Sequence, residues 1–596
     1  MNHQFIPVGA RYAPDSTTFI VWSPFRSVEL LLTGPAPAAH RMERDERGYW
    51  RCRAQVAPGS GYLFRLDGKD SFPDPASLQQ PTGVHGPSAV VDLSRFRWED
   101  EGWTGIPLAN MIIYELHAGV FTPSHDFDGI VTKLDHLADL GVNAIELMPL
   151  AQFPGNRNWG YDGAYPFAIQ HSYGGADGFR RLVNAAHQKG IAVVVDVVYN
   201  HFGPEGNYLA QYGPYFNDQY RTPWGSAINF DGAWSDEVRH FFFENARLLL
   251  EDFRVDALRL DAVHAMKDFS AIPFVQQLKE LASEIQRRTG RHKLLIAELD
   301  LNDPRYIHPP AKGGYGLDGQ WVDEFHHALR TLLTGDRKGY YEDFGEMDHL
   351  ERAFRNSYVY DGVYSAHRHR TFGSHADACP YDQFVVFDQN HDQVGNRACG
   401  DRLTANLTKP QLRLAAAAVL LSPYVPLLFM GEEYAERNPF PYFVSFDDPA
   451  LIKAVREGRA REFAGFAGGA STIPDPESPE TFERAVLSWD IDQPMLDFYK
   501  ELIRLRKTRP ALQGRTRDTM VVHPAIGNVL VLERKILSDQ VWIFLHLGAG
   551  TAEVENRTGQ ALRPIFGTEA LDGRPVHPGE PVRLAPWSAT VFEIQM

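Results

Sequence analysis

The sequence predicts an α/β protein: a (β/α)8 barrel preceded by a β-sandwich domain and followed by a second β-domain. Two observations support this. From about residue 110, strand-like and helix-like stretches alternate about eight times, as in successive βαβ units. In four stretches, an apolar run typical of a buried parallel strand ends in charged residues. These stretches cover residues 196–201, 258–264, 294–298 and 388–393. Catalytic groups of such barrels lie at the C-terminal strand ends, so we expect one site built from these distant segments.

The flanking regions have a different pattern. Residues 1–95 carry short alternating runs, such as 18–22 and 62–66, separated by turn residues, which indicates a small antiparallel sandwich. A linker is expected at 96–109, the catalytic barrel at 110–509 and the C-terminal β-domain at 510–596. In this last region, short strands are predicted at 528–533, 541–546 and 589–594.

Within the barrel, the predicted strands cover residues 112–116, 144–147, 191–195, 255–260, 293–297, 320–322, 383–387 and 425–429. The predicted helices cover 128–140, 177–189, 235–252, 271–288, a stretch that ends at 333, then 412–421 and 495–507. Ser235 is the expected N-cap of the third helix. The long loops at 148–175 and 201–234 are expected to build a pocket, because long loops at this face usually do.

Composition narrows the class of protein. Lys and Arg number 59 and Asp and Glu 76, a net charge of −17, which disfavours nucleic acid as a partner and suits a neutral substrate. The 3 cysteines give neither a disulfide framework nor a metal cluster. No basic-then-apolar leader opens the chain, and prolines break its most apolar region, 414–430. We therefore expect a cytoplasmic protein with no membrane partner; the sequence leaves its oligomeric state open.

Three carboxylates are the candidate catalytic groups. Asp261 follows the fourth strand, Glu298 the fifth and Asp392 the seventh. Acetal hydrolysis needs one carboxylate at the anomeric carbon and a protonated one at the leaving oxygen. Arg259 lies two residues before Asp261, on the same strand face, and would keep that aspartate ionised. Apolar neighbours would hold Glu298 in its acid form. Taken singly, each could instead be a solvated or salt-bridged residue.

Three histidines, His201, His264 and His391, fall at the same strand ends and could donate hydrogen bonds to sugar hydroxyls. A metal site is the alternative. We favour the first interpretation, because no His-x-x-x-His or Glu-x-x-His spacing accompanies them. No cofactor and no required metal are expected.

The four stretches resemble, in the right order, the four signature regions of the α-amylase superfamily of glycoside hydrolases, over residues 110–507. The resemblance implies that Asp261 is the nucleophile, Glu298 the acid/base and Asp392 the group that binds ring hydroxyls. It also implies that Asp196 braces Arg259.

By the same resemblance, Tyr161, in a Gly-rich loop, would stack on the sugar at the cleavage site; core packing is the alternative. The chain differs from many amylases at His264 and Ala265, where those enzymes have Lys and then His. Asn200 could still be a calcium-type ligand.

Segments 201–208, 260–265, 297–303, 391–397 and 431–433 are similar to the maltooligosyltrehalose trehalohydrolase family. That similarity implies retaining hydrolysis of the α-1,4 bond beside the terminal trehalose of maltooligosyltrehalose and related α-glucans. The alternatives are a glycogen-branching α-glucanotransferase and a non-catalytic glucan-binding barrel.

Four further residues are candidates for substrate binding. Asp323 and His327 would share one helix face after the sixth strand, and Trp224 and Asn396 lie in or beside loops at the mouth of the barrel. Helix packing is the alternative for the first two, and loop packing for Trp224.

Overall fold

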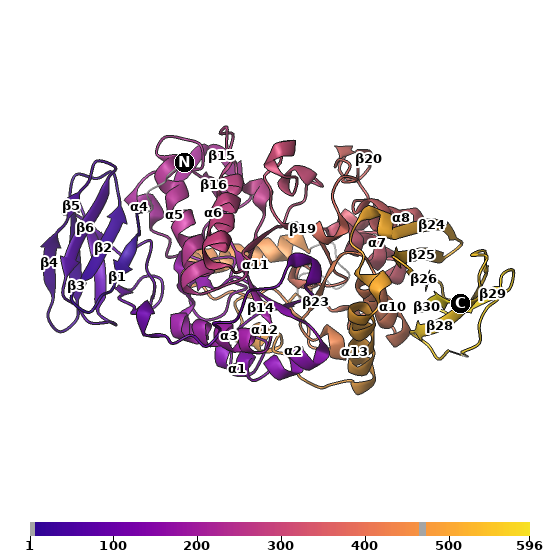
Figure 1. Ribbon diagram of the computed structural model, residues 1–596. Coiled ribbons are helices and arrows are strands. Elements are labelled where there is room, and N and C mark those ends of the chain that lie inside the picture. The colour runs from indigo at the N-terminus through magenta and orange to yellow at the C-terminus, as the bar shows by residue number, and fades with distance from the viewer. Residues whose placement is uncertain (1–5, 464–472, 572, 596) are drawn as a thin grey trace.

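The computed structural model describes residues 6–463, 473–571 and 573–595 (Figure 1). Its centre is a closed barrel of eight parallel strands in sequence order, which confirms the predicted fold class. Each observed strand begins and ends within two residues of its prediction. The strands are β10 (Ile113–Leu116), β11 (Ala144–Leu147), β14 (Ala192–Val197), β17 (Ala257–Leu260), β18 (Leu294–Ala297), β19 (Gly319–Trp321), β22 (Phe384–Val386) and β23 (Val425–Phe429).

Burial on both faces explains why these strands are continuous apolar runs. Every residue of β14 is buried, including Asp196 near its C-terminal end. Inward-facing side chains such as Ile113, Val194 and Phe387 form one apolar cluster. A second cluster lies between the strands and the surrounding helices. The polar strand ends therefore rest on a tightly packed base.

The surrounding helices are α3 (Gly175–Gln188), α5 (Ser235–Arg247), α6 (Phe274–Thr289), α7 (Asp323–Thr334), α10 (Lys409–Leu420) and α13 (Gln493–Thr508). Two expectations need correction. The helix expected at 128–140 is two helices, α1 (Phe127–Val131) and α2 (Leu134–Leu140), and between them the Thr132 hydroxyl bonds to the Gly129 carbonyl. Ser235 is the first residue of α5 and not its cap; Trp234, with a left-handed φ of 68°, takes that position.

The expected N-terminal sandwich is present as two antiparallel sheets. One contains β1 (Gly9–Arg11), β2 (Thr17–Trp22), β6 (Tyr49–Ala54) and β5 (Glu43–Arg44); the other contains β4 (Ala38–Arg41), β3 (Val28–Thr33), β7 (Gly61–Leu66), β8 (Ser71–Phe72) and β9 (Ser88–Ala89). Tyr49 and Arg47 bind Glu237 of α5, which fastens this sandwich to the barrel.

A buried histidine fastens the segment that follows the sandwich. His187 lies between Asp100 (2.7 Å) and Asp256 (2.9 Å), and its ring stacks on Trp103. All three charged side chains of this group are fully buried.

The C-terminal β-structure lies at the opposite end of the barrel from the sandwich (Figure 1). Its strands are β24 (Met520–Ile526), β25 (Val529–Ile536), β26 (Asp539–His546), β30 (Ser588–Ile594) and β28 (Leu562–Gly567), with a second sheet of β27 (Ala552–Glu555) and β29 (Pro581–Leu584). Arg534, fully buried, donates to the carbonyls of Leu421 and Gly514 and so joins these strands to the barrel. The domain boundaries at 95, 109 and 509 stay predictions.

The loops of the barrel contain elements that the sequence did not predict. They are β12 (Ala151–Gln152), β13 (Tyr165–Ile169), α4 (Leu209–Tyr212), β15 (Phe216–Thr222), β16 (Gly225–Ile228), α8 (Met347–Asn356), β20 (Val363–Ser365), β21 (Arg370–Phe372), α9 (His391–Gly395), α11 (Pro449–Glu462) and α12 (Pro479–Glu483). Across the ranges described, no helix combines the length and the apolar character needed to cross a bilayer. Residues 1–5, where a leader was sought, lie outside the described residues.

Candidate active site

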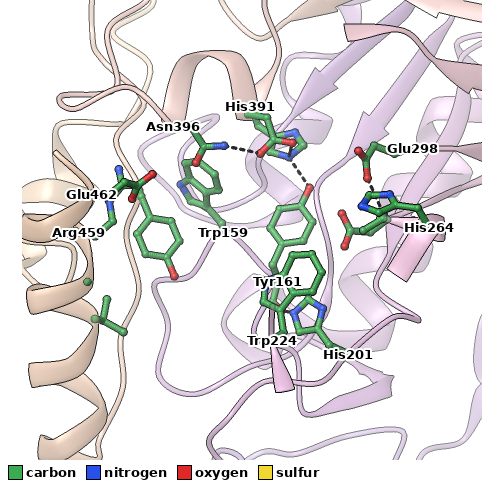
Figure 2. Close-up of a pocket in the computed structure, with 16 residues that line it drawn as sticks. Trp159, Tyr161, His201, Trp224, His264, Glu298, His391, Asn396, Arg459 and Glu462 are labelled. Carbon is green, nitrogen blue, oxygen red and sulfur yellow. Dashed lines mark hydrogen bonds and ion pairs between the residues drawn. The ribbon is translucent and has the colours of Figure 1, made fainter. Parts of the chain in front are cut away.

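The C-terminal ends of the barrel strands surround a cavity of about 500 Å³ (Figure 2). All three candidate carboxylates line it, although they follow three different strands, at residues 261, 298 and 392 of the sequence. The predicted residues among its lining are Tyr161, His201, Trp224, Asp261, His264, Glu298, His391, Asp392 and Asn396. The two long loops contribute Tyr161, His201 and Trp224, as the sequence led us to expect.

Arg259 lies beneath the cavity and organises its base. Its side chain is fully buried, and Nη1 donates to Asp196 Oδ2 (2.7 Å) and to Asp261 Oδ1 (2.9 Å). Nη2 is 3.8 Å from Glu298 Oε2, and the guanidinium lies over the ring of Trp321. One guanidinium therefore donates to two carboxylates and lies close to a third carboxyl group.

The Asp261 carboxylate is held on both oxygens. Asn200 Nδ2 donates to Oδ2 (2.7 Å) while Arg259 serves Oδ1. The Asn200 oxygen in turn contacts His201 Nδ1, so both polar groups of this asparagine are engaged within the site. Among the described residues, no group of three or more His, Cys, Asp or Glu side chains is arranged to hold a metal ion.

Glu298 is kept in its acid form. Burial raises the pKa of its carboxyl to about 8; the negative charge of Asp261 adds to this, while Arg259 opposes it. Its Oε2 accepts a hydrogen bond from the backbone of Ala262 (2.6 Å), the residue after Asp261. Ala262 has a left-handed φ of 40°, a strained backbone that places this N–H against Glu298. The backbone that follows Asp261 is therefore hydrogen-bonded to the carboxyl group of Glu298.

Asp392 has the opposite electrostatic environment. Burial alone would favour its neutral form, but the charge of His391, 3.4 Å away, lowers the pKa of Asp392 to about 2. His391 is itself held by Glu115, which accepts from Nδ1 (2.5 Å) and from the backbone N–H (2.9 Å). Burial would lower the pKa of His391, yet the charges of Asp392 and Glu115 raise it. Asp392 thus stays ionised, with Asn396 donating to its Oδ1 (3.1 Å).

Aromatic rings form the walls of the cavity. The Tyr161 hydroxyl donates to Asp196 Oδ2 (2.6 Å) and lies 2.7 Å from His391 Nε2, and its ring stacks on that histidine. Trp224 stacks on His201 with ring centroids 4.7 Å apart and remains about half exposed. Flat apolar faces beside hydrogen-bonding groups suit the faces and rims of sugar rings.

Comparison with known proteins identifies the family. The family model for the alpha-amylase catalytic domain matches residues 96–223. A malto-oligosyltrehalose trehalohydrolase of Saccharolobus solfataricus is 48% identical over 84% of this chain and 86% of its own length. The chain belongs to the malto-oligosyltrehalose trehalohydrolase family. The resemblance inferred from the signature stretches is therefore confirmed.

Two more distant matches agree with this assignment. A protein of Salmonella typhimurium, described provisionally as an alpha amylase, has a crystal structure that is 36% identical, with a TM-score of 0.89 over 99% of both chains. A 1,4-alpha-glucan branching enzyme of Corynebacterium glutamicum is 27% identical over 71% of this chain and 60% of its own length. The trehalohydrolase family is thus a much better match than the branching enzymes, which were the alternative.

Within the trehalohydrolase fold, three predicted residues need separate comment. His264 lines the cavity, and burial lowers the pKa of its ring, which is therefore neutral. Asp323 is not among the lining residues and accepts from Gln393 Nε2 (3.4 Å); burial raises its pKa to about 7. His327 is not part of the lining: its ring packs against Tyr340 and Phe344. For His327 the structure supports the alternative interpretation, helix packing.

Sequence reasoning missed one side of the cavity. The missed lining residues are Trp159, Tyr442, Val455, Gly458, Arg459 and Glu462. Trp159 had a signal, since it lies two residues before Tyr161 in the same loop. The others lie on α11 and the turn before it, with no polar strand end to mark them.

Proposed function

We propose that this protein hydrolyses the α-1,4-glucosidic bond beside the terminal trehalose of maltooligosyltrehalose, releasing trehalose with retention of configuration. The observation that carries the proposal is the pairing of Asp261 with Glu298 around one guanidinium, at the edge of a cavity large enough for sugar units. The substrate class rests on the named activity of the family.

In the first step, Asp261 attacks the anomeric carbon while Glu298 donates its proton to the oxygen that leaves with trehalose. Each group has the charge state that its role requires. Arg259 stabilises the charge of Asp261, and burial keeps the proton on Glu298 at neutral pH. A glycosyl ester forms on Asp261 as the glycosidic bond breaks.

In the second step, Glu298, now ionised, takes a proton from water, which displaces Asp261 and frees the maltooligosaccharide. Two inversions at the same carbon give retention, which requires the two carboxyl groups to be about 5–5.5 Å apart. Asp392, ionised and about two-fifths exposed, accepts hydrogen bonds from hydroxyls of the reacting ring. Tyr161 supplies the face on which this ring stacks.

Product analysis tests the proposal. Wild-type protein incubated with maltotriosyltrehalose should release trehalose quickly and should cleave maltopentaose slowly. Asp261→Ala should release none while retaining the wild-type melting temperature. A branching enzyme would instead change the iodine staining of amylose, and trehalose release at the wild-type rate by Asp261→Ala would refute the assignment of the nucleophile.

We also propose a cytoplasmic location, supported by the sparse cysteine content, which is usual in reducing compartments. Cell fractionation would test it.

A further inference from the structure

One edge of the cavity is built by a helix to which the mechanism assigns no role. Val455, Gly458, Arg459 and Glu462 of α11 all line the cavity. They are spaced three and four residues apart, so they share one helix face. Tyr442, from the loop before α11, lines the cavity too and lies against Arg459. We call this set the α11 face.

The polar groups of the α11 face are held in place. Arg459 Nη1 donates to Glu462 Oε2 (3.0 Å), and the guanidinium lies 5.3 Å from the centre of the Tyr442 ring. The Arg459 side chain is 14% exposed, whereas that of Glu462 is 51% exposed. A guanidinium and a carboxylate side by side offer donors and acceptors that match neighbouring hydroxyls of a glucosyl unit. The Tyr442 ring offers an apolar face for the same unit.

The position of this face decides which part of a substrate it meets. Figure 2 shows Arg459 and Glu462 across the cavity from Glu298 and His264, with Trp159 and Asn396 between them. Because Glu298 protonates the leaving oxygen, the leaving trehalose extends past Glu298. The glucan that stays on Asp261 extends in the opposite direction, toward the α11 face.

We propose that the α11 face binds the glucosyl units beyond the one attached to Asp261 and thereby sets the preference for chain length. This inference rests on the proposed function, since it takes its direction from the roles of Asp261 and Glu298. A substrate with one glucosyl unit before trehalose ends at Asp261, whereas maltotriosyltrehalose reaches the α11 face. The selectivity for the longer substrate is therefore determined by these residues.

Gly458 provides a steric test. A Cβ added at this position meets no other atom within 4 Å, so a larger side chain has room to enter the cavity. Leucine also favours a helix more than glycine does, so Gly458→Leu should fold at least as well as the wild type. Its side chain would occupy space that the proposal reserves for the glucan.

The experiment compares kcat/KM for maltotriosyltrehalose and for glucosyltrehalose in each variant. Arg459→Ala should lower the long-to-short ratio by about 10-fold or more, the effect expected for lost hydrogen bonds to a charged group. Gly458→Leu should also lower this ratio, because the leucine side chain occupies the space of the glucan. The matched control is Arg461→Ala, on the same helix. Its side chain is 74% exposed and pairs only loosely with Glu457 (3.8 Å), so its ratio should equal that of the wild type.

An unchanged ratio in both test variants would overturn the inference. If that unchanged ratio came with an equal loss of kcat/KM on both substrates, α11 would only support the fold. Failure of the proposed function would look different, because the wild type would release no trehalose from either substrate. Maltopentaose and maltotriose would then serve as the long and short substrates. A lower ratio of their kcat/KM values in Gly458→Leu would still support binding of glucan at the α11 face.

Discussion

The acid form of Glu298 leads to a quantitative prediction about pH. Its pKa of about 8, against an ordinary 4.5, corresponds to about 5 kcal/mol in favour of the neutral carboxyl, at about 1.4 kcal/mol per pKa unit. About nine in ten Glu298 side chains then carry the proton at pH 7, and about one in ten at pH 9. Trehalose release should therefore have an alkaline limb near pH 8, above which kcat/KM falls about tenfold per pH unit.

The assay is a pH profile of kcat/KM with maltotriosyltrehalose from pH 5 to pH 10, with a thermal melt at each pH to show that the protein stays folded. A substrate whose leaving group needs no proton supplies the control. The fluoride burst from α-maltosyl fluoride should lack the alkaline limb and should persist in Glu298→Gln. An alkaline limb below pH 6, or the same limb with the fluoride, would refute the role given to Glu298.

Three other substitutions test the base of the barrel. Arg259→Lys should lower kcat at least about 100-fold, because a compact ammonium on a flexible stem does not reproduce the fixed planar donors that bind Asp196 and Asp261; a loss below tenfold in steady-state kinetics would contradict this. Glu146 is buried on β11, and its carboxyl oxygens have no hydrogen-bond partner among the described residues. Burial raises the pKa of Glu146. Its contribution to the free energy of unfolding is therefore complete below pH 4.5 and is lost as the pH rises through the folded pKa. Glu146→Gln should therefore raise the free energy of unfolding by about 1–3 kcal/mol at pH 8 and by little at pH 4.5, measured by urea denaturation; a lower stability at pH 8 would count against it. His187→Gln should cost about 3–5 kcal/mol at pH 6, because the buried Asp256 loses its ion-pair partner, whereas Asp100 keeps Arg254 and Arg291. Asp100 and Asp256 raise the pKa of His187 against the effect of burial. The loss of stability in His187→Gln should therefore be complete below pH 6.5 and should shrink as the pH rises through the folded pKa. A loss of stability that grows with pH would contradict this prediction.

The candidate active site could be predicted because two independent patterns coincide there. Strands buried on both faces are mostly apolar, so a charged residue at a strand end stands out, as Asp261 and Glu298 do. Closure of the barrel then brings these ends to one mouth, whatever their separation in sequence. The same logic located Arg259, whose spacing from Asp261 puts both side chains on one strand face.

The α11 face could not be predicted in this way. α11 follows the last barrel strand, and its charged residues resemble those of any solvated helix. Only the fold shows that Arg459 and Glu462 turn toward the cavity. His327 illustrates the reverse case: its spacing from Asp323 is compatible with a shared site, but its ring is covered by the unpredicted segment that carries Tyr340 and Phe344. Helix periodicity predicts which residues share one face of a helix, but it does not predict which residues that face contacts.

The claim on which the mechanism depends is that Asp261 becomes covalently glycosylated. Glu298→Gln lacks the base for the second step, so α-maltosyl fluoride should leave a maltosyl group on this variant long enough for mass spectrometry. We predict that the peptide containing Asp261 gains the mass of one maltosyl group, and that the peptide from Asp261→Ala does not. An adduct on another carboxylate, or inverted configuration in the sugar released by the wild type, would contradict the account.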